Sequence, residues 1–346
     1  MSIKKLVLML VISIFSYSTT WADELALNPD HPDRYIVVKG DTLWDISTKF
    51  LRDAWRWPEI WHNNPDIANP HLIYPGDVIA LTYHNGKPVL TVQRRARPTV
   101  KLAPKAHATR IESAIPAVPA AAVGHFLSHP RVMSEEEIQN SGYILAAEDE
   151  RLVSASNTKV YVRGLPASDA KDYSILHIGR EYRHPETNDI LGYEAKHVSD
   201  AQLVREGDPA TLRITQAYRE TLIGDRVIVT DNDGTQRNFT PHAPEGETNG
   251  KIITIFDGVA NAGLYQSVVI NVGKDDGLEQ GHVLAIRQKG SEIRDHSAKT
   301  RSDRWVDLPD ERAALVMLYR VFDNVSYALV MKAEKDIRAG DLVTNP

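Results

Sequence analysis

The feature that most constrains the fold is a succession of β-prone runs that starts after residue 125. Branched and aromatic residues dominate each run, and Gly, Pro, Asn or Asp separate one run from the next. The spacing is typical of a sandwich or a small barrel, so we predict a mainly-β region. The runs are KVYVRG, YSILHIG, ATLRITQAY, RVIVT, KIITIF, SVVINV, HVLAI, ALVMLYRVF and VSYALVM.

This β region is predicted to contain two related modules, because a loop-like gap at 231–250 divides it. The two parts end alike: each pairs an alternating strand with a later Gly-Asp turn that enters another strand. These turns are Gly224-Asp225 and Gly340-Asp341. Gly-Asp is also a common turn sequence, so a chance likeness stays an alternative. One short helix is expected from the capping box that begins at Ser134 and ends at Glu137.

Residues 35–81 predict a different, small unit with the order strand, helix, helix, strand. YIVV and VIAL are β-prone runs at its two ends. Between them, Thr42 and Asp45 have the spacing of a capping box, and Leu43, Ile46 and Phe50 then recur on one helical face. Pro58 suits the first turn of the second helix.

The N-terminus indicates export. Two lysines precede a short apolar run and a small residue at position 22, the pattern of a cleavable signal peptide. The apolar run is too short for a comfortable membrane span, and no later stretch is long enough, so no transmembrane segment is expected in the mature chain. The chain has no cysteine, which excludes disulfides, a lipoprotein anchor and a cysteine nucleophile. An uncleaved membrane anchor is the alternative.

A basic, proline-containing spacer is predicted at 83–124. Its first part holds an Asn-Gly turn between β-prone runs, so part of it is expected to form a hairpin. Clustered Lys and Arg attract phosphates, but the spacer lacks interleaved aromatic residues and an exported protein rarely meets nucleic acid. We therefore expect no nucleic-acid partner.

Sequence traces of catalysis are weak. His125 and His129 have a metal-ligand spacing, but Pro130 follows and the glutamate of a zinc peptidase is missing. Ser156 and Lys159 fit a Ser-x-x-Lys pattern without the later Lys-Thr-Gly that accompanies it in penicillin-binding enzymes. No catalytic residue, metal site or cofactor is predicted.

The residues from Tyr35 to Leu81, YIVVKGDTLWDISTKF…WPEIWHNNPDIANPHLIYPGDVIAL, resemble a LysM domain, a βααβ module that binds peptidoglycan and chitin. The resemblance implies a shallow groove for N-acetylglucosamine units between two loops. Trp44 and Trp61 are expected in the core, because so small a module has little else to bury. Trp55 is left open between a partner contact and a cover over the core. The implied glycan-binding residues are Gly40, Asp41, Thr42 and Leu43 in the first loop and Pro70, Leu72, Ile73 and Tyr74 in the second.

The whole layout resembles the family of type IV pilus secretin-associated proteins, whose C-terminal region is related to that of flagellar assembly protein T. The supporting segments include NGKPVLTV, KVYVRGLP and IGDRVIV. The resemblance implies a periplasmic, non-enzymatic adaptor that anchors an outer-membrane secretin to peptidoglycan. The alternatives are a cell-wall hydrolase, or an activator of one, that the same module targets, and a structural envelope protein unrelated to pili.

The predicted fold class is α+β, a small LysM module followed by two small sandwich- or barrel-like modules. The expected organisation is a signal peptide at 1–22, the LysM module at 34–82, the spacer at 83–124, and β-rich modules at 125–230 and 251–346.

Overall fold

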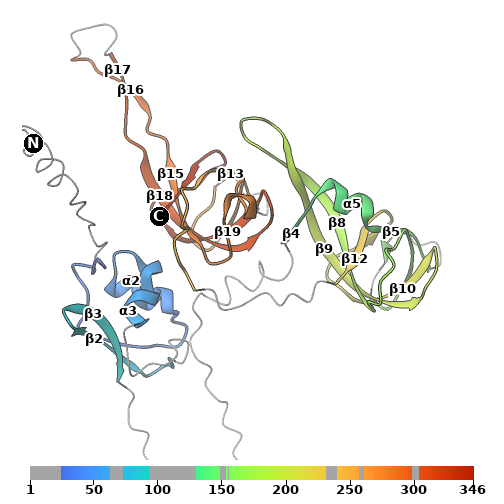
Figure 1. Ribbon diagram of the computed structural model, residues 1–346, viewed down its shortest axis with the longest axis horizontal. Coiled ribbons are helices and arrows are strands. Elements are labelled where there is room, and N and C mark those ends of the chain that lie inside the picture. Colours follow the sequence, from blue (N-terminus) through green and yellow to red (C-terminus); the bar gives the residue numbers. More distant parts are fainter. Residues whose placement is uncertain are drawn as a thin grey trace, which may run out of the picture. The chain divides into compact units, whose positions relative to one another are not determined.

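The computed structural model divides the chain into an N-terminal and a C-terminal unit (Figure 1). In the part of the chain that the structure describes, no helix is both long and apolar enough to cross a bilayer. The described residues are 25–62, 73–93, 130–148, 153–154, 156–230, 240–256, 261–297 and 304–346.

The N-terminal unit is a three-stranded antiparallel sheet with two helices. The sheet order is β1-β2-β3, and α3 contacts β3. The helices follow β1 as predicted, and Pro58 lies in the first turn of the second one. The elements are β1 (Arg34–Ile36), α2 (Leu43–Phe50), the short 3₁₀ turn η1 (Ala54–Arg56), α3 (Trp57–His62), β2 (Val78–His84) and β3 (Lys87–Gln93).

The helices bury the apolar face that the sequence indicates. Leu43, Ile46 and Phe50 are fully buried, and Trp44 and Trp61 lie in the same core, so the prediction of these two tryptophans as core residues is confirmed. Trp57, which the sequence did not single out, is buried as well. Three large aromatic side chains therefore supply much of the apolar area that holds so small a unit together.

The third strand of this sheet comes from the predicted spacer. Asn85 and Gly86 both have positive φ and form the tight turn of a β2–β3 hairpin, the geometry that favours Asn-Gly. Val89 and Leu90 of β3 are buried. The start of the basic segment is therefore part of the sheet.

The first β domain of the C-terminal unit is a seven-stranded sheet, ordered β10-β7-β5-β12-β8-β9-β4. Because β9 also pairs with β10, six of these strands close into a ring, with β4 added outside on β9. Helix α5 (Glu135–Asn140) begins with the predicted capping box: the Ser134 hydroxyl accepts from the Glu137 N–H, and the Glu137 carboxylate accepts from the Ser134 N–H.

The strands of this domain are β4 (Pro130–Met133), β5 (Gly142–Ala147), β6 (Val153–Ser154), β7 (Lys159–Arg163), β8 (Asp172–Arg183), β9 (Ile190–Arg205), β10 (Ala210–Ala217), β11 (Thr221–Leu222) and β12 (Arg226–Val229). The two short strands β6 and β11 pair with each other.

The second β domain is a closed barrel with the order β13-β14-β19-β18-β15-β20. Between β15 and β18 the chain forms a two-stranded arm of β16 and β17 (Figure 1). The elements are β13 (Asn249–Ile255), β14 (Ser267–Ile270), the 3₁₀ turn η4 (Lys274–Asp276), β15 (Val283–Gln288), β16 (Glu292–Arg294), β17 (Trp305–Asp307), β18 (Glu311–Val321), β19 (Ser326–Ala333) and β20 (Leu342–Thr344). The predicted fold class, a small α+β unit followed by a mainly-β region, is confirmed.

The two β domains have the same connectivity. Around the ring, the order is β5-β7-β10-β9-β8-β12 in the first domain and β13-β14-β19-β18-β15-β20 in the second. When the six strands of each domain are numbered along the chain, both orders are 1-2-5-4-3-6. Every pairing in both rings is antiparallel. This shared order supports the prediction of two related modules.

The Gly-Asp turns occupy equivalent places, directly before the sixth ring strand of each domain. Gly224 and Gly340 have φ of 92° and 93°. Each donates its N–H to a carbonyl of the first ring strand, Ile144 in one domain and Ile252 in the other, at 2.9 and 2.8 Å. The left-handed φ suits glycine, and the following carboxylate accepts a backbone N–H three residues earlier, at Leu222 or Arg338.

The far end of the β8–β9 hairpin packs against the barrel. The hydroxyl of Tyr182, on β8, lies 3.1 Å from that of Tyr327, on β19, and both side chains are buried. Burial raises the pKa of both hydroxyls, so they stay protonated and one can donate to the other. At the tip of the hairpin, Glu186 accepts from Lys251 of β13 at 2.6 Å.

Candidate glycan-binding site

The end of β1 is bonded to the turn that leads into β2. Val37 donates its N–H to the carbonyl of Asp77 at 2.9 Å and accepts from Gly76 at 2.8 Å. The Asp77 carboxylate also accepts from the Tyr74 N–H at 3.0 Å, which closes the turn. Val37 lies just before the first predicted loop, and Gly76 and Asp77 lie just after the second. These hydrogen bonds therefore hold the two loops next to each other.

The first predicted loop has an open backbone at its start and a buried end. Gly40 is exposed with φ of 102°, and a Cβ there would meet nothing within 4 Å, so a ligand could approach this backbone closely. Asp41 is half-buried. Thr42 and Leu43 are buried, and α2 begins at Leu43.

Of the second predicted loop, Ile73 is fully buried and Tyr74 is half-buried, while Pro70 and Leu72 lie outside the described residues. The side chains of Thr42, Leu43 and Ile73 therefore face the interior, where they support the loops from behind. Gly40, Asp41 and Tyr74 remain accessible. The contact of any of these residues with a glycan stays a prediction.

Two exposed apolar residues beside the first loop were missed in the sequence analysis. Ile36 and Val38 are 59% and 52% exposed, on either side of the buried Val37. Alternation with a period of two places them on the outer face of the chain that enters the loop. The signal was present in the YIVV run, where one of two alternating apolar faces had to point outward.

The segment between the two helices is fixed by an ion pair. The Arg56 guanidinium is almost fully buried and donates to both carboxylate oxygens of Glu59, each at 2.7 Å. Such a two-point contact fixes both side chains. Trp55 in this segment is half-buried.

The structure describes one of the two weak catalytic patterns, that of Ser156 and Lys159. The Ser156 hydroxyl accepts from the Ala217 N–H, and the Lys159 ammonium pairs with Glu148 at 3.1 Å, so the two side chains have different partners. His125 and His129 lie outside the described residues.

The fold and the joined loops define a small βααβ module with an added strand. Residues 35–82 match the LysM domain family. A LysM domain implies binding to peptidoglycan or a related carbohydrate, and it is a binding module and not a catalytic one. Such domains typically occur in cell-wall-associated or extracellular proteins.

A curated relative shares a short part of the sequence. The uncharacterized protein YqbP of Bacillus subtilis (strain 168) is 38% identical over 60 residues. The match covers 14% of this chain and 27% of that protein, so the chain spans about a quarter of the relative's length.

Proposed function

We propose that the chain is an exported, non-enzymatic adaptor that holds a protein complex to peptidoglycan. The observation that carries the proposal is the LysM domain at 35–82, followed by a separate unit of two β domains. A binding module joined to large β domains suits a protein that links two structures. Residues 1–22 act in this proposal as the signal peptide that brings the chain to the periplasm.

The glycan is proposed to bind along the two loops that meet beside Val37. The exposed backbone at Gly40 and the accessible Asp41 and Tyr74 supply hydrogen-bonding groups. Buried Leu43 and Ile73 hold the loops in shape. A single shallow site of this kind binds weakly, so attachment depends on many copies acting together.

The protein partner is proposed to be an outer-membrane secretin of a type IV pilus. The support is the resemblance of segments across residues 85–346 to secretin-associated proteins. The two β domains, which are joined through the buried Tyr182–Tyr327 contact, form the part that binds this partner.

Sedimentation with purified peptidoglycan sacculi tests the glycan site. The full chain should sediment with sacculi, and Asp41→Ala and Tyr74→Ala should each reduce the bound fraction several-fold. Tyr83→Ala is the matched control, since Tyr83 is 64% exposed near the turn of the β2–β3 hairpin. Absence of sedimentation, or equal binding by all variants, would refute the glycan site. Release of soluble muropeptides from the sacculi would refute the non-enzymatic reading.

Fractionation of the outer membrane tests the partner. The full chain should co-purify with a secretin, and a chain lacking residues 125–346 should lose the secretin while it still sediments with sacculi. A secretin that stays bound to the shortened chain would assign the contact to the N-terminal unit and contradict the proposal.

A further inference from the structure

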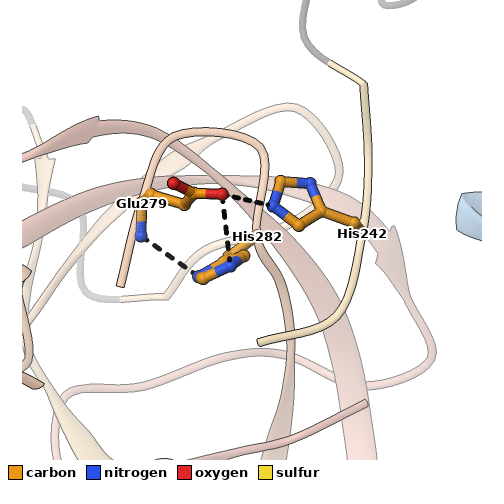
Figure 2. Close-up of side chains that lie close together, drawn as sticks. All are labelled: His242, Glu279 and His282. Carbon is orange, nitrogen blue, oxygen red and sulfur yellow. Dashed lines mark hydrogen bonds and ion pairs between the residues drawn. The ribbon is translucent and has the colours of Figure 1, made fainter. Parts of the chain in front are cut away.

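Two histidines and a glutamate lie close together where the chain enters the barrel of the second β domain (Figure 2). His242 and His282 form an isolated parallel bridge, in which Val283 donates its N–H to the His242 carbonyl at 2.8 Å. Glu279 comes from the turn just before His282, and the two imidazole rings lie 4.6 Å apart, centroid to centroid. The cluster therefore joins segments that are far apart in sequence.

The contacts of His242 require a positive charge on or beside its ring. Its Nδ1 lies 2.9 Å from the Thr240 carbonyl, which only accepts, so Nδ1 carries a proton. Its Nε2 lies 2.9 Å from a carboxylate oxygen of Glu279. In the neutral ring this nitrogen is an acceptor, and two acceptors at that distance need a positive charge between them. A proton or a metal ion could supply it.

The third group favours a metal ion. His282 Nε2 lies 3.9 Å from the same Glu279 oxygen, and one ligand atom from each residue lies within 4.8 Å of the others. Zinc bonds of about 2.0–2.2 Å in a tetrahedron place ligand atoms about 3.3–3.5 Å apart, between the 2.9 and 3.9 Å seen here. Two histidines and a glutamate are a zinc ligand set, and a histidine that donates its other N–H to a carbonyl is the usual second contact of a zinc ligand.

We propose that His242 Nε2, His282 Nε2 and Glu279 bind one zinc ion. The side chains of His242 and Glu279 are 42% and 70% exposed, so the site opens to solvent and a water molecule completes the tetrahedron. The ion would tie the segment that precedes the barrel to the turn before β15.

One contact must change for zinc to bind. His282 Nδ1 accepts from the Glu279 N–H at 3.1 Å, which leaves the proton of the neutral ring on Nε2. Zinc at Nε2 moves that proton to Nδ1 and breaks this hydrogen bond. Zinc binding therefore also requires the Glu279 N–H to turn away from His282 Nδ1, because two donors cannot face each other at that distance.

The surroundings of His282 agree with a ligand role. The side chain is buried. The barrel topology does not demand the cluster, because the equivalent turn of the first ring, residues 164–171 before β8, contains no histidine.

Zinc titration of the untagged full chain tests the proposal, with a chromophoric chelator as competitor. The wild type should bind zinc at least tenfold more tightly than His242→Gln and Glu279→Gln, both of which change exposed side chains and should fold. The matched control is His296→Gln, which removes an exposed histidine near the end of β16 and should bind like the wild type.

Two results would overturn the zinc site. One is equal zinc affinity, or no affinity, across the wild type and all three variants. The other comes from nitrogen NMR spectra of the histidine side chains, which should show His242 Nε2 shifting on addition of zinc. A doubly protonated His242 whose signals do not respond would assign the positive charge to a proton. Circular dichroism confirms that each variant is folded.

Discussion

The two β domains share one strand order, but the connection between their third and fourth ring strands is buried in one domain and exposed in the other. In the first domain, the third and fourth ring strands form the long β8–β9 hairpin, whose Tyr182 is buried against the barrel. In the second domain, the equivalent connection extends into the β16–β17 arm, where Ile293, Trp305 and Val306 are about half exposed. Connectivity thus follows from turns and pairing, whereas the role of a projecting hairpin depends on the residues along its faces.

The largest effect is expected where the hairpin of the first domain meets the barrel. Tyr327 is fully buried, and its ring contacts those of Tyr182, Phe256, Tyr319 and Phe322. Tyr327→Ala should lower the free energy of unfolding by about 3–5 kcal/mol, because it leaves a large cavity. Urea unfolding followed by circular dichroism measures it. Tyr182→Phe, which removes only a hydroxyl but leaves that of buried Tyr327 unpaired, should cost about 1–3 kcal/mol, and a loss beyond that of Tyr327→Ala would contradict the assignment of the effect to packing.

The next prediction compares the two equivalent Gly-Asp turns. Asp225 is buried and bonds both the Leu222 N–H, at 2.7 Å, and His177, at 2.8 Å, so Asp225→Ala should cost about 2–3 kcal/mol. Asp341 is half-buried, and Asp341→Ala should cost about 1 kcal/mol. Thermal unfolding of both variants checks the order. Equal losses would mean that the turn alone, and not its surroundings, sets the contribution.

A smaller, pH-dependent difference is expected at His197, on β9. Burial lowers its pKa and outweighs the carboxylate of Asp200, 2.8 Å away, which acts in the opposite direction. Tyr218 is a further titratable group beside the ring. As the pH falls, the unfolded chain takes up the proton first, at about pH 6.5. The stability that neutral His197 contributes is therefore fully present above that pH and is lost below it.

Urea midpoints measured between pH 7.5 and 5 test this prediction. The wild type should lose more stability over this range than His197→Gln, which cannot titrate at this position. Parallel curves for the two proteins would show that other groups cause the acid sensitivity.

The smallest effect is expected on the arm. Val306→Asp places a charge on a side chain that is already 44% exposed, so the free energy of unfolding should change by no more than about 0.5 kcal/mol. Thermal unfolding measures this change. A loss comparable with that of Tyr327→Ala would mean that the arm, like the β8–β9 hairpin, is covered in the folded protein.

Local signals predicted much of the fold. The capping box at Ser134, the Asn85-Gly86 turn and the buried helix face of Leu43, Ile46 and Phe50 all depend on residues close in sequence. Strand β9 was missed because its inward positions include Glu194, His197 and Ser199, whose polar side chains hide the alternation. The closure of each ring could not be predicted, because it depends on pairing between distant strands such as β9 with β10.

At the candidate sites too, local features could be predicted and features that depend on distant residues could not. The resemblance to LysM domains located both loops, but it did not indicate that Thr42, Leu43 and Ile73 would be buried. At the proposed zinc site, the spacing of Glu279 and His282 was a local signal that went unused. His242 lies in a gap that the sequence marked only as loop-like, and only the parallel bridge brings it to the other two.

The shared strand order also has a consequence for folding. Every ring strand has a counterpart in the other domain, so a strand could pair in the wrong ring while the chain folds, a failure known for repeated domains. The fifth strands differ sharply: Ser326–Met331 of β19 are all buried, whereas β10 exposes Arg213, Thr215 and Gln216. An exchange would expose apolar residues in one ring and bury polar ones in the other. The divergence of equivalent strands therefore disfavours the pairing of a strand in the wrong ring.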